Sequence, residues 1–294
     1  MFQGTHTAIV TPFRDGNLDE SAFQSLIDYQ LENQINGIVP VGTTGESPTV
    51  SHEEHRRIIE ITVEHTAKRA LVIAGTGSNS TREAVALSQD AEKAGADACL
   101  LVAPYYNKPS QVGLFEHFKA IAEATSLPLI LYSIPGRCVI EIGVETTARL
   151  ADTCPNIRTI KEAGGSVERV NALVQALPDD FQILSGDDSM TLPFMAAGGA
   201  GVISVASNII PAEMVALTRA MLERRLEEAQ AIHRKFYRLF HTLLKLDTNP
   251  VPIKAALGLM GRIDPSLRRP LAPLSTEGVT ELAEVLRDLH LIDC

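Results

Sequence analysis

The sequence lacks the features that mark several large classes of protein. Its 294 residues include only four cysteines, with no CxxC pair: Cys99, Cys138, Cys154 and Cys294. We expect these to be free thiols in a reducing compartment. No apolar segment is long enough to span a bilayer, and the N-terminus lacks both the basic region and the apolar run of a signal peptide. These absences predict a cytoplasmic protein that does not insert into membranes.

Positive charge is also scarce. The chain has 26 lysines and arginines against 36 aspartates and glutamates, which gives a formal net charge of −10. No basic block offsets this charge, and the arginine pairs at 224–225 and 268–269 are too short to bind a phosphate backbone. A nucleic acid or an anionic membrane is therefore not an expected partner. The hydrophobic content of 45% is typical of a well-packed globular enzyme.

Short apolar runs, most of them separated by helical patterns, dominate the first two thirds of the chain. Their β-branched character is typical of strands buried on both faces of a parallel sheet. The predicted strands are Thr7–Phe13, Gly37–Gly42, Ala70–Gly77, Ala98–Tyr106, Pro128–Pro135, Ile157–Glu162, Phe181–Asp188 and Gly201–Asn208.

Helix signals occupy most of the intervening segments. Ser51 with Glu54 three residues later is a capping-box pattern. The other predicted helices run from Asp19 to about Asn36, from Thr81 to Ala94, from Ser110 or Gln111 to Ala124, from Ser166 to Leu177 and from Ser189 to Ala197. Repeated β-α units over about 220 residues predict a (β/α)₈ barrel. A doubly wound sheet is the alternative, but no GxGxxG follows the first strand.

The strand signal stops after Pro211, and the rest of the chain reads as helical. One long charged helix is expected at Glu213–Leu246, followed by two more around Ile253–Met260 and Thr276–Leu289. We therefore predict two domains: a catalytic barrel over residues 1–224 and a C-terminal helical domain over residues 225–294.

Lys161 stands at the end of the sixth predicted strand, in the stretch IRTIKEAGG. An ammonium buried there loses hydration, which lowers its pKa and leaves a free amine that can attack a carbonyl. The alternative is a lysine that reaches solvent or pairs with Glu162.

Other polar residues gather where the predicted strands end, which is the catalytic face of such a barrel. The turn GTTGE, from Gly42 to Glu46, can hold an anion with backbone N–H groups and the hydroxyls of Thr43 and Thr44, or can simply be a tight turn. Tyr132 is either a proton relay or a core aromatic. Arg137 offers a bidentate fork for a carboxylate, and it could equally be solvated. Together these residues fit an amine that captures a carbonyl.

Two groups resemble metal ligands but do not predict a metal site. His52 and His55 belong to HEEH rather than HExxH, and no third ligand lies nearby. Asp187 and Asp188 occupy a position where a helix N-cap is expected, and we interpret them as the cap.

The combined motifs closely resemble the dihydrodipicolinate synthase family of pyruvate-dependent class I aldolases. The matching stretches are GTTGES at 42–47, PYYNKPSQ at 104–111, YSIPGR at 132–137, IKEAGG at 160–165, LSGDD at 184–188, GVISV at 201–205 and NPVPIK at 249–254.

The resemblance implies a Schiff base between Lys161 and pyruvate, with no separate cofactor and no metal. It implies that Thr43 and Thr44 hold the pyruvate carboxylate, and that main-chain groups of Gly186 and Ile203 border the site. Thr43, Tyr132 and Tyr106 would relay protons, with Tyr106 supplied by a neighbouring subunit of a homotetramer built from two tight dimers. Arg137 would bind the carboxylate of aspartate 4-semialdehyde, and the product would be 4-hydroxy-tetrahydrodipicolinate.

The resemblance also implies an allosteric site for L-lysine at the tight-dimer interface. The matching positions are Ser47, His52, His55, Asn79, Glu83 and Tyr105. A solvated interface helix is the alternative.

Three positions depart from the family pattern: Ser133 and Cys138, which we expect to flank the second-substrate pocket, and Pro48 beside the lysine site. The alternative functions are therefore a sister aldolase, such as N-acetylneuraminate lyase or a 2-keto-3-deoxy-sugar-acid aldolase, and a non-catalytic ligand-binding barrel.

Overall fold

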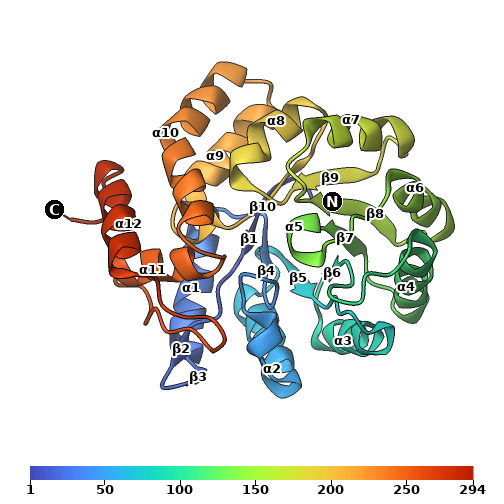
Figure 1. Ribbon diagram of the computed structural model, residues 1–294, viewed down its shortest axis with the longest axis horizontal. Helices are drawn as coiled ribbons and strands as arrows, with labels where there is room; N and C mark the ends of the chain where they lie inside the picture. The colour runs from blue at the N-terminus through green and yellow to red at the C-terminus, as the bar shows by residue number, and fades with distance from the viewer. Residues whose placement is uncertain (294) are drawn as a thin grey trace.

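The apolar runs form a closed barrel of parallel strands in the computed structural model, which describes residues 1–293. The order around the barrel is β1-β10-β9-β8-β7-β6-β5-β4 (Figure 1). The predicted (β/α)₈ barrel is therefore confirmed, and the doubly wound sheet is excluded. The barrel strands are β1 (Gly4–Ala8), β4 (Gly37–Val39), β5 (Leu71–Gly75), β6 (Ala98–Val102), β7 (Leu129–Ser133), β8 (Ile157–Glu162), β9 (Gln182–Ser185) and β10 (Gly201–Ser204).

Helices surround the barrel, and several begin where the sequence provides a cap. The Ser51 hydroxyl accepts the Glu54 N–H while the Glu54 carboxylate accepts the Ser51 N–H, so the predicted capping box is confirmed. The helices of the ring are α1 (Glu20–Glu32), α2 (His52–Thr66), α3 (Thr81–Ala94), α4 (Gln111–Ala124), α6 (Val144–Thr153), α7 (Val167–Ala176), α8 (Thr191–Ala196) and α9 (Pro211–Leu222). The short helix α5 (Pro135–Cys138) follows β7 and lies inside this ring, at the mouth of the barrel (Figure 1).

Each barrel strand is buried on both faces, because alternate side chains enter two different cores. In β7, Ile130 belongs to the cluster inside the barrel and Leu131 to the cluster between barrel and helices. Leu100 and Leu101 divide in the same way in β6. This alternation fixes which strand-end side chains point into the barrel.

The C-terminal segment differs from the prediction of one long helix at Glu213–Leu246. The chain instead turns between α9 and α10 (Leu226–Lys245), where Arg224 has a left-handed φ of 60° and the Arg225 N–H donates to the Ala220 carbonyl. The apolar pattern continues on both sides of this turn, so periodicity alone does not reveal it. The prediction of a single helix was wrong, and the expected division at residue 224 falls at the turn.

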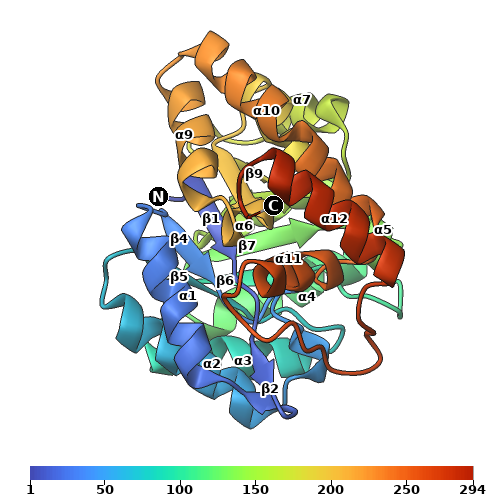
Figure 2. The ribbon, with the colours of Figure 1, turned by 90° about the vertical axis from the view of Figure 1, so that its left-hand side faces the viewer.

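Helices α10, α11 (Val251–Leu259) and α12 (Thr276–Asp288) pack on one another beside the barrel (Figure 2). Phe236 and Leu243 of α10 belong to the same buried cluster as the outer barrel residues. The division into two domains stays a prediction. None of the helices within residues 1–293 is both long and apolar enough to cross a membrane.

Several predicted boundaries were wrong. The first strand starts at Gly4 and ends at Ala8, and most other strands end before the polar rim residues that were included in them. Helix α1 ends at Glu32, because Gln34 turns the chain with a φ of 60°. Helix α6 was missed because Gly143 precedes it and provides no side-chain cap. The short hairpin of β2 (Phe13–Arg14) and β3 (Asn17–Leu18) was missed as well.

The cysteines within the described residues are unpaired. Cys99, Cys138 and Cys154 are free thiols, as predicted, and all three are buried, whereas Cys294 lies outside the described residues.

Candidate active site

Lys161 points into the barrel at the carboxyl end of β8. It is in register with Tyr132 of β7 and Leu184 of β9, both members of the inner cluster. Only 5% of the residue is exposed, and its Nζ lies 4.0 Å from the centre of the Tyr132 ring. The next residue, Glu162, points out of the barrel and pairs with Arg169. The alternative of a solvated lysine or a Lys161–Glu162 pair is therefore excluded.

The surroundings of Lys161 favour a neutral amine. Burial lowers its pKa from 10.5 to about 7, with the Arg137 cation acting in the same direction and Asp188 opposing. Asp188 is itself buried; its Oδ2 accepts the N–H groups of Val205 (3.1 Å) and Ala206 (2.8 Å), and burial raises its pKa to about 6. An amine with a pKa near neutrality can attack a carbonyl without prior loss of a proton.

Tyr132 is buried beside Lys161. This position favours a role in proton transfer over that of an aromatic side chain that only packs in the core. Burial raises the pKa of its phenol, with the Arg137 cation and the Thr43 hydroxyl acting in the opposite direction. Thr43 and Tyr132 line one small cavity of about 30 Å³ at the mouth of the barrel. The structure therefore brings Thr43, Tyr132 and Lys161 together, as predicted.

The turn from Gly42 to Glu46 presents backbone N–H groups at the carboxyl end of β4. Within residues 1–293 the N–H groups of Thr43 and Thr44 have no hydrogen-bond acceptor, so they are free to meet a ligand. The Thr44 hydroxyl is already engaged, because it accepts from Asn249 Nδ2 at 2.9 Å. The Thr44 backbone is thus better placed than its side chain to hold an anion.

Arg137 lies on α5 at a cleft of about 570 Å³. Its Nη2 donates to Thr248 Oγ1 (3.1 Å) and to the Asn249 carbonyl (2.8 Å), so the loop after α10 orients the guanidinium. The residues that line this cleft are Ile134, Gly136, Arg137, Ala163, Gly186, Asp187, Leu244, Thr248 and Asn249.

Gly186 connects this cleft to Lys161. A Cβ at this position would lie 3.0 Å from Lys161 Cε and 2.6 Å from Ala163 Cβ, so only glycine fits. Ile203 is fully buried inside the barrel on β10. The Asp187 side chain accepts the Ser189 N–H at 3.0 Å and caps the 3₁₀ turn at Asp188–Met190, as predicted. Within residues 1–293 no cluster of His, Cys, Asp or Glu could hold a metal ion.

Tyr106 is not brought to this site within one chain. Its side chain is 88% exposed, and its backbone has a left-handed φ of 72° that is unusual for a bulky residue. Tyr105 beside it is 37% exposed.

A separate cavity of about 210 Å³ contains five of the six positions expected for lysine: Ser47, His52, His55, Glu83 and Tyr105. His52 Nε2 lies 3.0 Å from Glu83 Oε1, and the hydroxyl of Ser78 donates to the same carboxylate, which holds the pKa of Glu83 below its usual range. Asn79 is not among the lining residues, and Ser78 takes its place. This cavity and the small cavity at Tyr132 share Ser47, Gly75 and Gly77 as walls.

The two departures do not themselves line the cleft at Arg137, although each is adjacent in sequence to a residue that does. Ser133 is fully buried, points away from the barrel and approaches the Ile142 N–H at 3.4 Å. Cys138 is also buried and donates its thiol to the Ala103 carbonyl at 3.1 Å. Neither residue lines the cleft at Arg137. Pro48 does line the cavity at Glu83.

Comparison with known proteins places this geometry in a family. The model of the dihydrodipicolinate synthetase family matches residues 1–289. The chain belongs to this family. A 4-hydroxy-tetrahydrodipicolinate synthase of a Sulfurihydrogenibium species is 51% identical over 293 residues, which is 99% of this chain and 100% of that protein. The predicted family is thus confirmed.

Solved structures of the dihydrodipicolinate synthetase family have the same fold. The 4-hydroxy-tetrahydrodipicolinate synthase of Methylacidiphilum fumariolicum SolV superposes with a TM-score of 0.96 at 52% identity, with full coverage of both chains. An Acinetobacter baumannii enzyme in complex with pyruvate superposes with a TM-score of 0.97 at 44% identity, and the match covers 99% of this chain and all of that one. A Cyanidioschyzon merolae enzyme with lysine bound superposes with a TM-score of 0.95 at 39% identity, and the match covers 99% of each chain.

Proposed function

We propose that the chain condenses pyruvate with L-aspartate 4-semialdehyde to form 4-hydroxy-tetrahydrodipicolinate, on the route to diaminopimelate and lysine. The observation that carries this proposal is the buried, weakly basic amine of Lys161 at the mouth of the barrel. The full-length relatives that bear the name of this synthase support the same reaction.

In this proposal the Lys161 amine attacks the keto carbon of pyruvate and loses water to form a cationic imine. The imine withdraws electrons from the neighbouring methyl group, which releases a proton and becomes a carbon nucleophile. The nucleophile attacks the aldehyde, and the amino group of the semialdehyde then displaces Lys161 as the ring closes. A pyruvate complex of the Acinetobacter baumannii relative supports pyruvate as the first substrate.

Backbone and side-chain groups around Lys161 serve the pyruvate half of the reaction. The free N–H groups of Thr43 and Thr44 hold the carboxylate. Tyr132, which lines one cavity together with Thr43, carries protons to and from the intermediate. Gly186 and Ile203 border the site with backbone groups.

Arg137 serves the aldehyde half. Its guanidinium borders the 570 Å³ cleft beside Lys161 and binds the carboxylate of the semialdehyde. Because Ser133 and Cys138 face away from this cleft, they leave the acceptor contacts intact. A sugar-aldehyde specificity therefore needs another cause than these two departures.

The proposal is tested by initial rates with pyruvate and a panel of aldehydes. Aspartate 4-semialdehyde should give the highest kcat/KM, above N-acetylmannosamine and sugar-derived aldehydes. A preference for a sugar aldehyde would assign the chain to a sister aldolase instead. The absence of turnover with every aldehyde would favour a binding barrel.

The pH dependence of imine formation should follow the amine of Lys161. Trapping of pyruvate by cyanoborohydride requires the neutral amine, so its rate should rise about tenfold from pH 6 to pH 8 and then level off. With a lysine of ordinary pKa, the trapping rate would continue to rise through pH 9. Since Arg137 lowers the pKa of Lys161, Arg137→Gln should move the midpoint to higher pH. An unchanged midpoint would contradict this electrostatic assignment.

We further propose that L-lysine inhibits the enzyme by binding the cavity at Glu83. The Glu83 carboxylate, held by His52 and Ser78, would receive the ammonium of the ligand. The shared walls Ser47 and Gly75 connect this cavity to the one at Tyr132. The lysine complex of the Cyanidioschyzon merolae relative supports the idea.

Removal of the Glu83 charge should weaken this inhibition. Glu83→Gln should raise the lysine concentration for half inhibition about tenfold, because one charge-assisted contact is lost. Glu53→Gln, an exposed glutamate on the neighbouring helix α2, is the matched control and should leave inhibition unchanged. If millimolar lysine leaves the wild-type rate untouched, the proposal fails.

The exposed Tyr106 supports an assembly of several chains. A large aromatic side chain with 88% exposure and a left-handed backbone is suited to contact a neighbouring subunit. We propose that Tyr106 completes the relay of Thr43 and Tyr132 in a partner chain of a homotetramer. Sedimentation of the active enzyme as a monomer would contradict this.

A further inference from the structure

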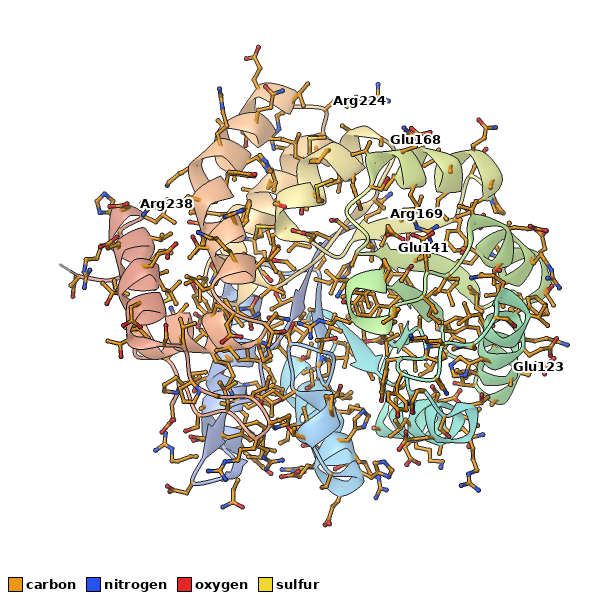
Figure 3. The ribbon with its side chains drawn as sticks, in the orientation of Figure 1. Glu123, Glu141, Glu168, Arg169, Arg224 and Arg238 are labelled. Carbon is orange, nitrogen blue, oxygen red and sulfur yellow. The ribbon has the colours of Figure 1, made fainter. Side chains whose placement is uncertain are left out.

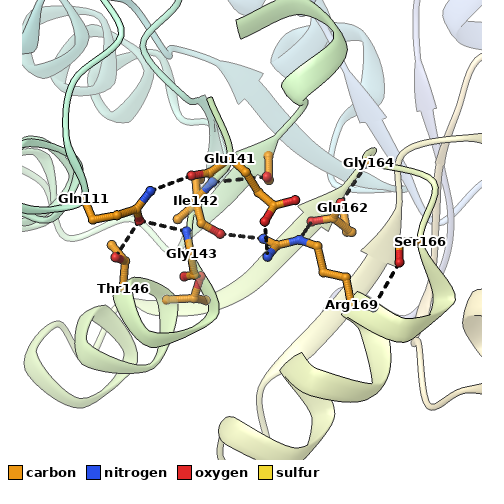
Figure 4. Close-up of polar contacts among 11 residues, drawn as sticks. Gln111, Glu141, Ile142, Gly143, Thr146, Glu162, Gly164, Ser166 and Arg169 are labelled. Carbon is orange, nitrogen blue, oxygen red and sulfur yellow. Dashed lines mark hydrogen bonds and ion pairs between the residues drawn. The ribbon is translucent and has the colours of Figure 1, made fainter. Parts of the chain in front are cut away.

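One buried arginine outside the barrel connects the segments that follow two functional side chains. Arg169 on α7 has only 8% of its side chain exposed. Its Nε donates to Glu162 Oε2 at 2.7 Å, its Nη1 to Glu141 Oε1 at 3.0 Å and its Nη2 to the Ile142 carbonyl at 2.5 Å. Figure 4 shows these three contacts, which converge on one guanidinium from two different segments.

The first segment is the end of β8. Glu162 directly follows Lys161, and its fully buried carboxylate also accepts the Gly164 N–H at 2.7 Å. Because consecutive side chains of a strand point to opposite faces, fixing Glu162 outside the barrel fixes the direction of Lys161 inside it. Glu162 and Arg169 together thus hold the strand end from which the amine projects.

The second segment follows helix α5, which carries Arg137. Glu141 and Ile142 lie just beyond that helix, and Gln111 of α4 holds the same segment by donating to the Glu141 carbonyl (2.8 Å) and accepting from Gly143 (2.9 Å). The segment therefore has two anchors, one on α4 and one at Arg169.

We propose that Arg169 is a positioning residue that sets the distance between the Lys161 amine and the acceptor-binding Arg137. The proposal rests on the proposed function, in which these two side chains serve the two substrates. A guanidinium suits this task because its planar donors diverge at fixed angles, whereas a lysine offers one flexible point of charge. Misplacement of reacting groups by about 1 Å can cost about a hundredfold in rate.

Glu141 allows one half of the connection to be tested alone. Its side chain is 45% exposed, so Glu141→Gln should leave the fold stable. The substitution weakens the ion pair with Arg169 that holds the segment after α5. Glu168→Gln is the matched control, because Glu168 is an exposed neighbour on the same helix as Arg169 and lies apart from the contact (Figure 3). Both variants remove one negative charge from the same region.

The expected result is a split between the two substrates. Glu141→Gln should raise KM for the preferred aldehyde about fivefold or more, while the rate of pyruvate trapping by cyanoborohydride stays within about twofold of wild type. Glu168→Gln should change neither quantity. Equal kinetics for the two variants, or equal losses on both substrates, would overturn the proposal.

Arg169→Lys tests the connection to the end of β8. It keeps a cation beside the buried Glu162 but removes the planar guanidinium. Trapping of pyruvate should slow about tenfold or more in this variant, since the strand end loses its fixed anchor. Trapping at the wild-type rate in folded protein would contradict the assignment. If this variant does not fold, Glu141→Gln alone decides the matter.

Failure of the proposed function would be seen separately. The wild-type aldehyde panel identifies the preferred acceptor before any variant is compared. If that acceptor is not aspartate 4-semialdehyde, the proposed function fails, and the variants are compared with the acceptor that the enzyme prefers.

Discussion

Lys161→Met should lower turnover of pyruvate and aspartate 4-semialdehyde by at least about a thousandfold, because it removes the protein nucleophile of the proposed mechanism. Methionine is apolar and of similar length, so it suits a site that is only 5% exposed. An arginine there would keep a permanent charge in a buried position and confuse the result.

The control for this variant is its own stability. Because the buried amine is replaced by an apolar side chain, the melting temperature should stay near or above that of wild type. A folded Lys161→Met protein that retains more than about a tenth of wild-type turnover would contradict a covalent role for this residue.

The second large effect is expected on stability. Lys254 of α11 and Glu46 of the GTTGE turn form an ion pair at 2.7 Å, and both side chains are fully buried. Lys254→Met should lower the free energy of unfolding by about 3–5 kcal/mol, because Glu46 would be left as a buried charge without its cation. Denaturant titration measures this difference directly.

The same pair connects the C-terminal helices to the turn from Gly42 to Glu46. Lys254 Nζ also donates to the Thr11 carbonyl at 2.9 Å, and Glu46 Oε2 accepts the Arg268 N–H at 3.1 Å. Glu46 itself has a left-handed φ of 56°, so the turn that carries Thr43 and Thr44 depends on this anchor. We therefore expect KM for pyruvate to rise in Lys254→Met as well.

A double variant separates the ion pair from the packing. Adding Glu46→Gln to Lys254→Met removes the uncompensated charge and should recover much of the lost stability. The two single losses should therefore not add. Strict additivity would mean that the pair contributes no more than its separate side chains.

The barrel could be predicted because its strands are encoded locally. Runs such as Ile157–Glu162 need burial on both faces, and turn residues separate them at regular intervals. The turn at Arg224 could not be predicted, since one left-handed residue broke a helix whose apolar pattern continued. Helix α6 was hidden for a related reason: it begins after Gly143 without a capping side chain.

The polar rim was predictable because the barrel brings all strand ends to one face. Thr43 and Tyr132 line one cavity there, and the Lys161 amine lies over the Tyr132 ring. The connections behind the rim were not predicted, since Arg169 and Glu141 are distant in sequence and resemble ordinary surface charges. Only the burial of Arg169 and the contact between the two side chains distinguish them.

The most direct test of the account is to locate the adduct that pyruvate forms with the wild-type protein. The protein is incubated with pyruvate and cyanoborohydride near pH 7, digested, and its modified peptide identified by mass spectrometry. The account predicts a single adduct on Lys161. An adduct on another lysine, or none at all, would contradict it.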